Sequence, residues 1–180
     1  MLQTQTYTLG EEIASLDDRL TALKDRINDL EPGTGEYDAA QSQKSRLQYY
    51  KIGLVWQRDE AGWGSDAELT LGALSALEEA EMDRHIPSNA GQKERRLWFA
   101  AASTVSAPNV DDDDDIEAAF AALTVHPGYA SWVEAEANDL GVPSESGNRS
   151  STSSTATGTS ATSTDGPGET TTSSSDSRTG

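Results

Sequence analysis

The chain has 180 residues, 31 acidic and 13 basic side chains, a formal net charge of −18 and no cysteine. This length fits one ordinary domain or a small domain with appendages, and the lack of cysteine excludes disulfides, thiol nucleophiles and thiolate metal sites. The acidity argues against nucleic acid as a partner, because phosphate binding needs clustered Lys and Arg. No apolar run approaches the roughly 18–20 residues that cross a bilayer, so we expect no membrane partner.

The first predicted element is a long helix that begins near Thr8. Its apolar residues follow +4, +3 spacing through three heptads, which is typical of a coiled-coil seam. Thr8 followed by Glu11 predicts a capping box, and Pro32 between Glu31 and Gly33 ends the helix. The seam residues are Leu9, Ile13, Leu16, Leu20, Leu23, Ile27 and Leu30.

A return helix is predicted over about 36–58, so residues 1–62 should form an antiparallel helical hairpin. Its apolar stripe is poorer and consists of Ala40, Leu47, Tyr50 and Leu54, thickened by Ile52, Val55 and Trp56. Because the first helix is better patterned than its partner, the seam also indicates self-association or binding of an external helix.

Residues 63–143 are predicted to form a small domain of about four short helices. Residues 66–71 form either a short extended stretch or a helix cap, and Leu74 and Leu77 should point inward from the helix that follows. No multistranded sheet is indicated, so the predicted fold class is all-α. The helices are expected over about 72–85, about 92–105, from Ile116 after the Asp run, and from Pro127 to Gly141.

The third segment, 144–180, is predicted to be disordered. It has 22 Ser or Thr among 37 residues and no large apolar side chain, so it cannot bury enough surface to offset the entropy of ordering. A solvating tail or linker is the preferred interpretation. The acceptor pattern Asn148-Arg149-Ser150 and the Ser/Thr tract allow a glycosylated stalk instead, which needs export.

The acid excess extends beyond any single patch, since residues 1–143 hold 27 acids against 11 bases. Acid-rich chains with few lysines are typical of a salt-rich cytoplasm, where a Debye length of about 3 Å at molar salt makes self-repulsion tolerable. An ordinary acidic mesophilic protein is the alternative. The first five residues lack the basic and apolar regions of a signal peptide. We therefore expect a protein of a high-salt cytoplasm that is not secreted and requires molar salt to fold.

No pattern predicts a catalytic, cofactor or metal residue. His85 and His126 lie where solvated or capping histidines are common, and a zinc site would need further ligands. The run 111–115 fails the calcium-loop pattern at its sixth and twelfth positions and instead predicts a helix start.

Phosphate-binding glycine loops and nucleophile elbows are missing from the sequence. Glu78, Glu79 and Glu81 form a charged solvent face rather than a catalytic carboxylate pair. The chain is therefore predicted to be non-enzymatic and to require no cofactor.

The stretch Glu68-Leu69-Thr70-Leu71-Gly72-Ala73-Leu74-Ser75-Ala76-Leu77-Glu78-Glu79 resembles a segment of tail assembly chaperones of long-tailed viruses. In that family a short extended stretch leads into a Leu- and Glu-rich helix. Similar features follow over about 67–141: Ala100-Ala101-Ala102-Ser103, Asp115-Ile116-Glu117-Ala118-Ala119-Phe120 and Asn138-Asp139-Leu140. The resemblance implies a small, acidic, helical protein that binds the tape-measure protein during tail assembly. With the acidic composition it points to a haloarchaeal tailed virus.

A chaperone of this kind needs apolar grooves between short helices for its client. The candidate partner-binding residues are Leu69, Leu71, Leu74, Leu77, Trp98 and Phe120, of which at least half are expected to be plain core. The alternative is a non-enzymatic structural or adaptor protein, such as a virion connector component or a coiled-coil oligomerisation module.

Overall fold

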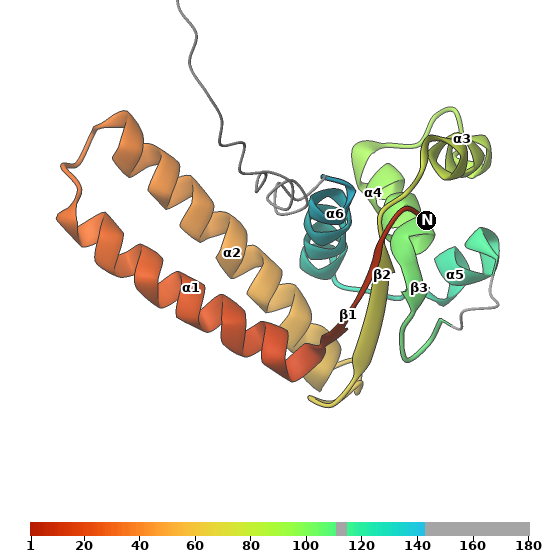
Figure 1. Cartoon of the computed structure of the whole chain (residues 1–180), viewed down its shortest axis with the longest axis horizontal. Coiled ribbons are helices and arrows are strands. Elements are labelled where there is room, and N and C mark those ends of the chain that lie inside the picture. Colours follow the sequence, from red (N-terminus) through yellow and green to blue (C-terminus); the bar gives the residue numbers. More distant parts are fainter. Residues whose placement is uncertain (111–114, 143–180) are drawn as a thin grey trace, which may run out of the picture. The chain divides into compact units, whose positions relative to one another are not determined.

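The computed structural model describes residues 1–110 and 115–142 (Figure 1). The predicted tail, 144–180, and Asp111–Asp114 lie outside the described residues. Six helices contain 65% of the described residues. The chain also forms a small three-stranded antiparallel sheet. The all-α prediction is therefore correct about the predominance of helix and wrong in excluding a sheet.

The hairpin consists of α1 (Leu9–Asp29) and α2 (Gly35–Asp59). Six seam residues of α1 are buried in the core with Leu47 and Leu54 of α2, and Leu30 is partly buried beside them. The seam therefore packs within one chain.

The start of α1 is held by backbone rather than by the predicted capping box. The Thr8 side chain makes no capping hydrogen bond, because Thr8 ends a strand. The N–H groups of Leu9 and Gly10 donate instead to the carbonyl oxygens of Ala67 and Ser65, at 2.9 and 2.8 Å. These bonds satisfy helix N–H groups that lack intrahelical partners.

The sheet has the order β1 (Thr4–Thr8), β2 (Glu68–Gly72), β3 (Thr104–Ser106), with β2 in the centre. Thr4 lies opposite Gly72 and Thr8 opposite Glu68. The helix predicted over 92–105 ends at Ser103, because the β-branched residues Thr104 and Val105 enter β3. The extended alternative for residues 66–71 is thus the correct one.

The remaining helices follow the predicted order, and α6 lies at the centre of their packing. Tyr129, Trp132 and Val133 of α6 are fully buried. Trp132 packs edge-on against Tyr7 of β1 at 5.3 Å between ring centroids, which joins α6 to the sheet. The four helices are α3 (Ala76–His85), α4 (Gln92–Ser103), α5 (Ile116–Ala122) and α6 (Pro127–Gly141).

Helices α2 and α6 meet backbone to backbone at Gly53 and Gly128. A Cβ atom at Gly53 would lie 2.1 Å from the Tyr129 nitrogen, and one at Gly128 would lie 2.3 Å from the Tyr49 oxygen. This contact and the β1–β2 pairing make residues 1–62 and the following helices parts of one compact unit, Met1–Pro143. The boundary predicted between residues 62 and 63 does not separate two compact units.

Gly53→Ala should therefore destabilise the protein by about 2 kcal/mol, since the added methyl group meets immovable backbone. Gly35→Ala in the same helix is the control, because a Cβ there has nothing within 4 Å. The control should change stability by less than about 1 kcal/mol. Urea unfolding of both variants measures the difference, and equal midpoints would contradict the close contact.

A cluster of carboxylates lies where α1, α6 and β1 meet. The Tyr7 hydroxyl donates to Glu136 Oε2 at 3.4 Å. Burial raises the pKa of Glu136, and the negative charge of Glu12 raises it further. Burial also raises the pKa of Glu12, while Arg19 opposes both shifts. Ionised Glu12 and Glu136 therefore lower the free energy of unfolding at neutral pH.

Glu136→Gln should stabilise the protein at pH 7, because it removes a charge that is less favourable in the folded than in the unfolded state. A carboxyl with a raised folded pKa weakens folding once pH exceeds its unfolded pKa. The advantage of the variant should therefore shrink as pH falls toward the ordinary value of 4.5. Chemical unfolding at several pH values tests this, with the exposed Asp18→Asn as a charge-matched control. An equal gain in the control would attribute the effect to net charge alone.

Candidate protein-binding site

Three segments that are distant in the sequence enclose one pocket of about 480 Å³. They are α3 with the residues before it, the end of α4, and the start of α5. The apolar lining comes from Leu74, Met82, Ala102 and Ile116, and the polar lining from Glu78, Glu81, His85, Asp115 and Glu117.

An aromatic stack packs beside this pocket. Trp98 of α4 lies parallel to Phe120 of α5, with 3.9 Å between ring centroids and 9° between planes. It also stacks with His85 of α3 at 6.0 Å. His85 Nδ1 lies 3.0 Å from Glu117 Oε1, so α3 and α5 are linked across the pocket. Trp98 and Met82 belong to a small core distinct from the main one, and Phe120 packs against it.

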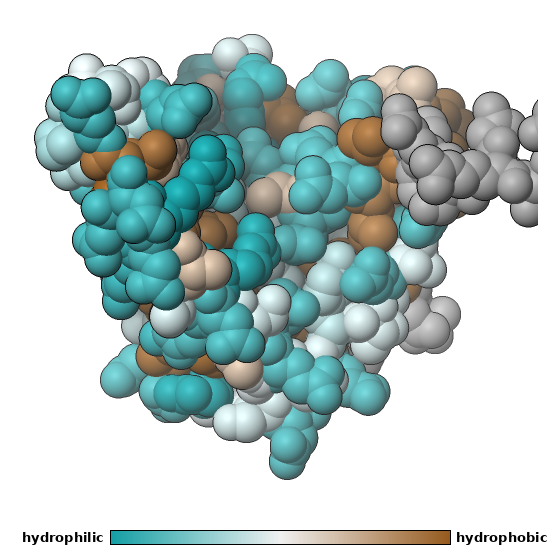
Figure 2. Space-filling view, turned by 60° about the vertical axis from the view of Figure 1, so that its left-hand side comes forward, coloured by the Kyte–Doolittle hydropathy of each residue, from teal (hydrophilic) through white to brown (hydrophobic). Residues whose placement is uncertain are grey.

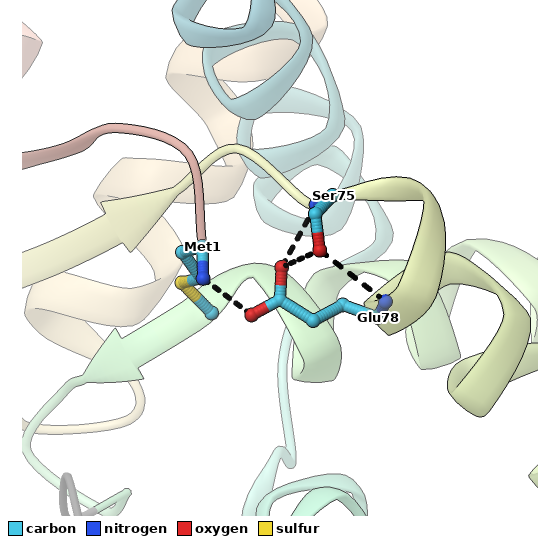
Figure 3. Close-up of polar contacts among 3 residues, drawn as sticks. All are labelled: Met1, Ser75 and Glu78. Atoms are coloured by element: carbon cyan, nitrogen blue, oxygen red, sulfur yellow. Dashed lines mark hydrogen bonds and ion pairs between the residues drawn. The ribbon is translucent and has the colours of Figure 1, made fainter.

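The position of α3 depends on a capping box at Ser75 and Glu78 (Figure 3). Ser75 N donates to Glu78 Oε2 at 2.8 Å, and Ser75 Oγ accepts from Glu78 N. The other carboxylate oxygen pairs with the ammonium group of Met1. This ammonium first, and then the Ser75 N–H, lower the pKa of Glu78 to about 2. Glu78 therefore carries a negative charge at neutral pH.

Helix α5 begins at a similar cap on the opposite side of the pocket. Asp115 Oδ1 accepts a hydrogen bond from Ala118 N at 2.8 Å, which confirms the predicted helix start for Asp115. Carboxylates at helix N-termini are favoured by the helix dipole. Two helix N-termini thus place Glu78 and Asp115 at one pocket.

The charge of the lining defines what can bind there. Four carboxylates and one histidine line the pocket, and neither Lys nor Arg does. Within residues 1–110 and 115–142, no three His, Asp or Glu side chains are grouped to hold a metal ion. Apolar and carboxylate groups together favour a ligand with apolar and basic groups, such as one face of a helix.

The structure brings three of the six predicted partner-binding residues to this region. Leu74 lines the pocket, and Trp98 and Phe120 stack beside it. Leu69 and Leu71 lie on the buried face of β2 and are fully enclosed in the main core, which leaves them closed to a partner.

The inward orientation predicted for Leu77 is wrong, since this side chain is 72% exposed. Leu77 lies five residues before the buried Met82 and thus about 140° away around the helix. The predicted helix began near residue 72, whereas the Ser75 cap starts α3 at Ala76. His126 caps α6 by accepting from Gly128 N at 3.0 Å, one of the two roles expected for it.

A second, larger hollow of about 910 Å³, which no sequence pattern predicted, lies along the hairpin. It lies between one face of α1 and one face of α2, and its apolar lining is Ile13, Leu20, Ile52, Val55 and Trp56. The sequence pattern predicts the last three to thicken the inner stripe of α2, whereas they line this hollow. Figure 2, which turns the hairpin side forward, shows a mostly hydrophilic face with separate hydrophobic patches.

Comparison of the chain with protein-family models, curated proteins and solved structures finds no match. Among the described helices, none combines the length and apolar character that a bilayer crossing requires.

Glu78→Gln should destabilise the protein above pH 4.5, because the native state favours the ionised carboxylate. A carboxyl with a lowered folded pKa contributes stability above its unfolded pKa and loses it as pH falls through the folded value. The deficit of the variant should therefore diminish between pH 4.5 and about 2.

Thermal unfolding of a chain without an N-terminal tag, across this pH range, measures the effect. The matched control is Glu79→Gln, an exposed first-turn residue of the same helix. A constant deficit at all pH values would contradict the proposed role of the ionised carboxylate.

Proposed function

We propose that this protein is a tail assembly chaperone of a haloarchaeal long-tailed virus and binds the tape-measure protein during tail assembly. One observation carries the proposal. Six of the nine residues that line the pocket come from three of the four short stretches on which the resemblance rests: Leu74, Glu78, Ala102, Asp115, Ile116 and Glu117. Stretches that resemble one family separately in sequence thus meet at one surface.

The pocket can bind a helical client, and this function requires no chemical reaction. An apolar side chain of the client would enter between Leu74, Met82 and Ile116, and a Lys or Arg one turn away would reach Glu81 or Glu117. The net charge of −18 would keep the complex soluble while the client is held. Since four carboxylates line the pocket, binding of a basic client would be salt-sensitive.

A second candidate function is that of a structural or adaptor component of the particle. The exposed hollow along α1 and α2 favours it, because these are the longest described helices and present an uncovered apolar surface. Purified particles separate the two functions. A chaperone is missing from the finished particle, whereas a structural component is present at a fixed copy number.

The decisive experiment is expression of the tagged chain with its native gene neighbourhood in high salt, followed by mass spectrometry of what co-purifies. We expect a long, helical, tape-measure-like protein. Glu81→Lys should reduce its recovery about tenfold, because the substitution turns attraction of a basic client into repulsion. Glu79→Lys, on the same helix but outside the pocket lining, should leave recovery unchanged.

Circular dichroism of both variants controls for loss of fold. Recovery of portal, tube or capsid proteins would favour the structural function. Equal losses in the two variants would reject the pocket as the client site.

A further inference from the structure

The hollow along the hairpin is lined by two parallel stripes with the same spacing. Residues 13, 17, 20 and 24 of α1 and residues 48, 52, 55 and 59 of α2 each follow +4, +3, +4 steps. This is the spacing with which helices pack against further helices in bundles. Ile13 and Leu20 of the seam thus also border an open surface between the two helices, on which half of these eight positions are polar or charged.

Apolar side chains of this surface remain exposed to solvent. Ile52 is 57% exposed, and Val55 and Trp56 are partly exposed beside it. Ile13 and Leu20 of α1 form the floor. Burial of the exposed Ile52 side chain against a partner is therefore favourable, because it removes apolar surface from water.

The charges along the hollow are ordered from one end to the other. Lys51 and Asp17 form an ion pair between the two helices, and Arg58 pairs with the adjacent Asp59. Within the described residues, Lys24 and Glu60 form no ion pair. Lys24 leaves one end positive, and Glu60 leaves the other end negative.

The Asp17–Lys51 ion pair shows which residues of α1 and α2 lie at the same level along the hairpin. Seven residues further along α1, Lys24 lies level with residue 44, seven residues back along α2. Ile52 is halfway between residue 44 and Glu60. The two unpaired charges are therefore about 24 Å apart along the hairpin, with Ile52 at the midpoint.

We propose that a second copy of this chain covers the hollow, in an antiparallel two-fold dimer whose axis passes near Ile52. A two-fold axis reverses the surface along its length, so α1 would lie on α1 and α2 on α2 of the other copy. Lys24 of each copy would then lie level with Glu60 of the other, on the neighbouring helix across the hollow. Three bases and three acids line this surface, so it is electrically neutral on a chain of charge −18. Two copies can approach here without the repulsion that the total charge imposes elsewhere.

Sedimentation velocity of the full chain at the lowest KCl concentration that preserves its helical circular dichroism tests the dimer. We expect a particle of twice the 19.2 kDa chain mass. Ile52→Asp should yield monomers, because it places a carboxylate at the axis opposite its own copy. Leu77→Asp replaces an even more exposed apolar side chain outside the hollow and should leave the dimer intact.

A charge exchange tests the antiparallel arrangement itself. Lys24→Glu and Glu60→Lys, each alone, should weaken dimerisation about tenfold, because each creates two like-charge contacts per dimer. The double variant should restore wild-type dimerisation. Neither residue is buried, so both single variants should fold.

Three results would overturn the inference. A monomeric wild-type chain would show that the hollow is not a self-association surface, whatever other helix binds there. A dimer that persists in Ile52→Asp would place the interface elsewhere. Failure of the double charge variant to recover would exclude the antiparallel register.

Discussion

The backbone contact between α2 and α6 is the constraint on which the rest of the structure depends. Gly53 and Gly128 let the two helices approach until no Cβ atom would fit between them. Beside this contact Gln57, fully buried, accepts the His126 backbone N–H at 3.0 Å. The contact fixes α6 on the hairpin, and α6 in turn contacts β2 and α4. Because α3 and α5 pack on α4, and α4 packs on α6, the contact between α2 and α6 also fixes the position of the pocket.

Local patterns predicted the elements whose packing partners are close in the sequence. The +4, +3 spacing of the seam identified α1, and the turn at Pro32 identified the hairpin, because both signals are contained in the segments themselves. The sheet escaped prediction since β1 is the polar stretch Thr-Gln-Thr-Tyr-Thr, in which only Tyr7 is buried. Its strand character comes from pairing with β2, some sixty residues later, which no window of sequence contains.

The candidate site could be predicted only in part for the same reason. Its stretches were recognised separately, but their convergence depends on α3 and α5 both packing on α4. Leu77 shows how sensitive such assignments are to helix phase. In the helix that starts at Ala76 rather than near Gly72, Met82 points inward and Leu77 lies in solvent. The capping box that sets this phase was present in the sequence as Ser75 and Glu78, three residues apart.

The irregular apolar pattern of α2 has a physical explanation. One face, with Leu47 and Leu54, packs in the core that α1 shares, and a second, at Gly53 and Gln57, meets α6. A helix with contacts on two faces distributes its apolar residues around its circumference, so a single stripe is hard to see. The mismatch between the two hairpin helices therefore requires no external partner for the seam. The third face, centred on Ile52, is an apolar part of α2 that the described chain leaves uncovered. An interaction of this hairpin with another helix should thus occur through that face, with the intrachain seam remaining closed.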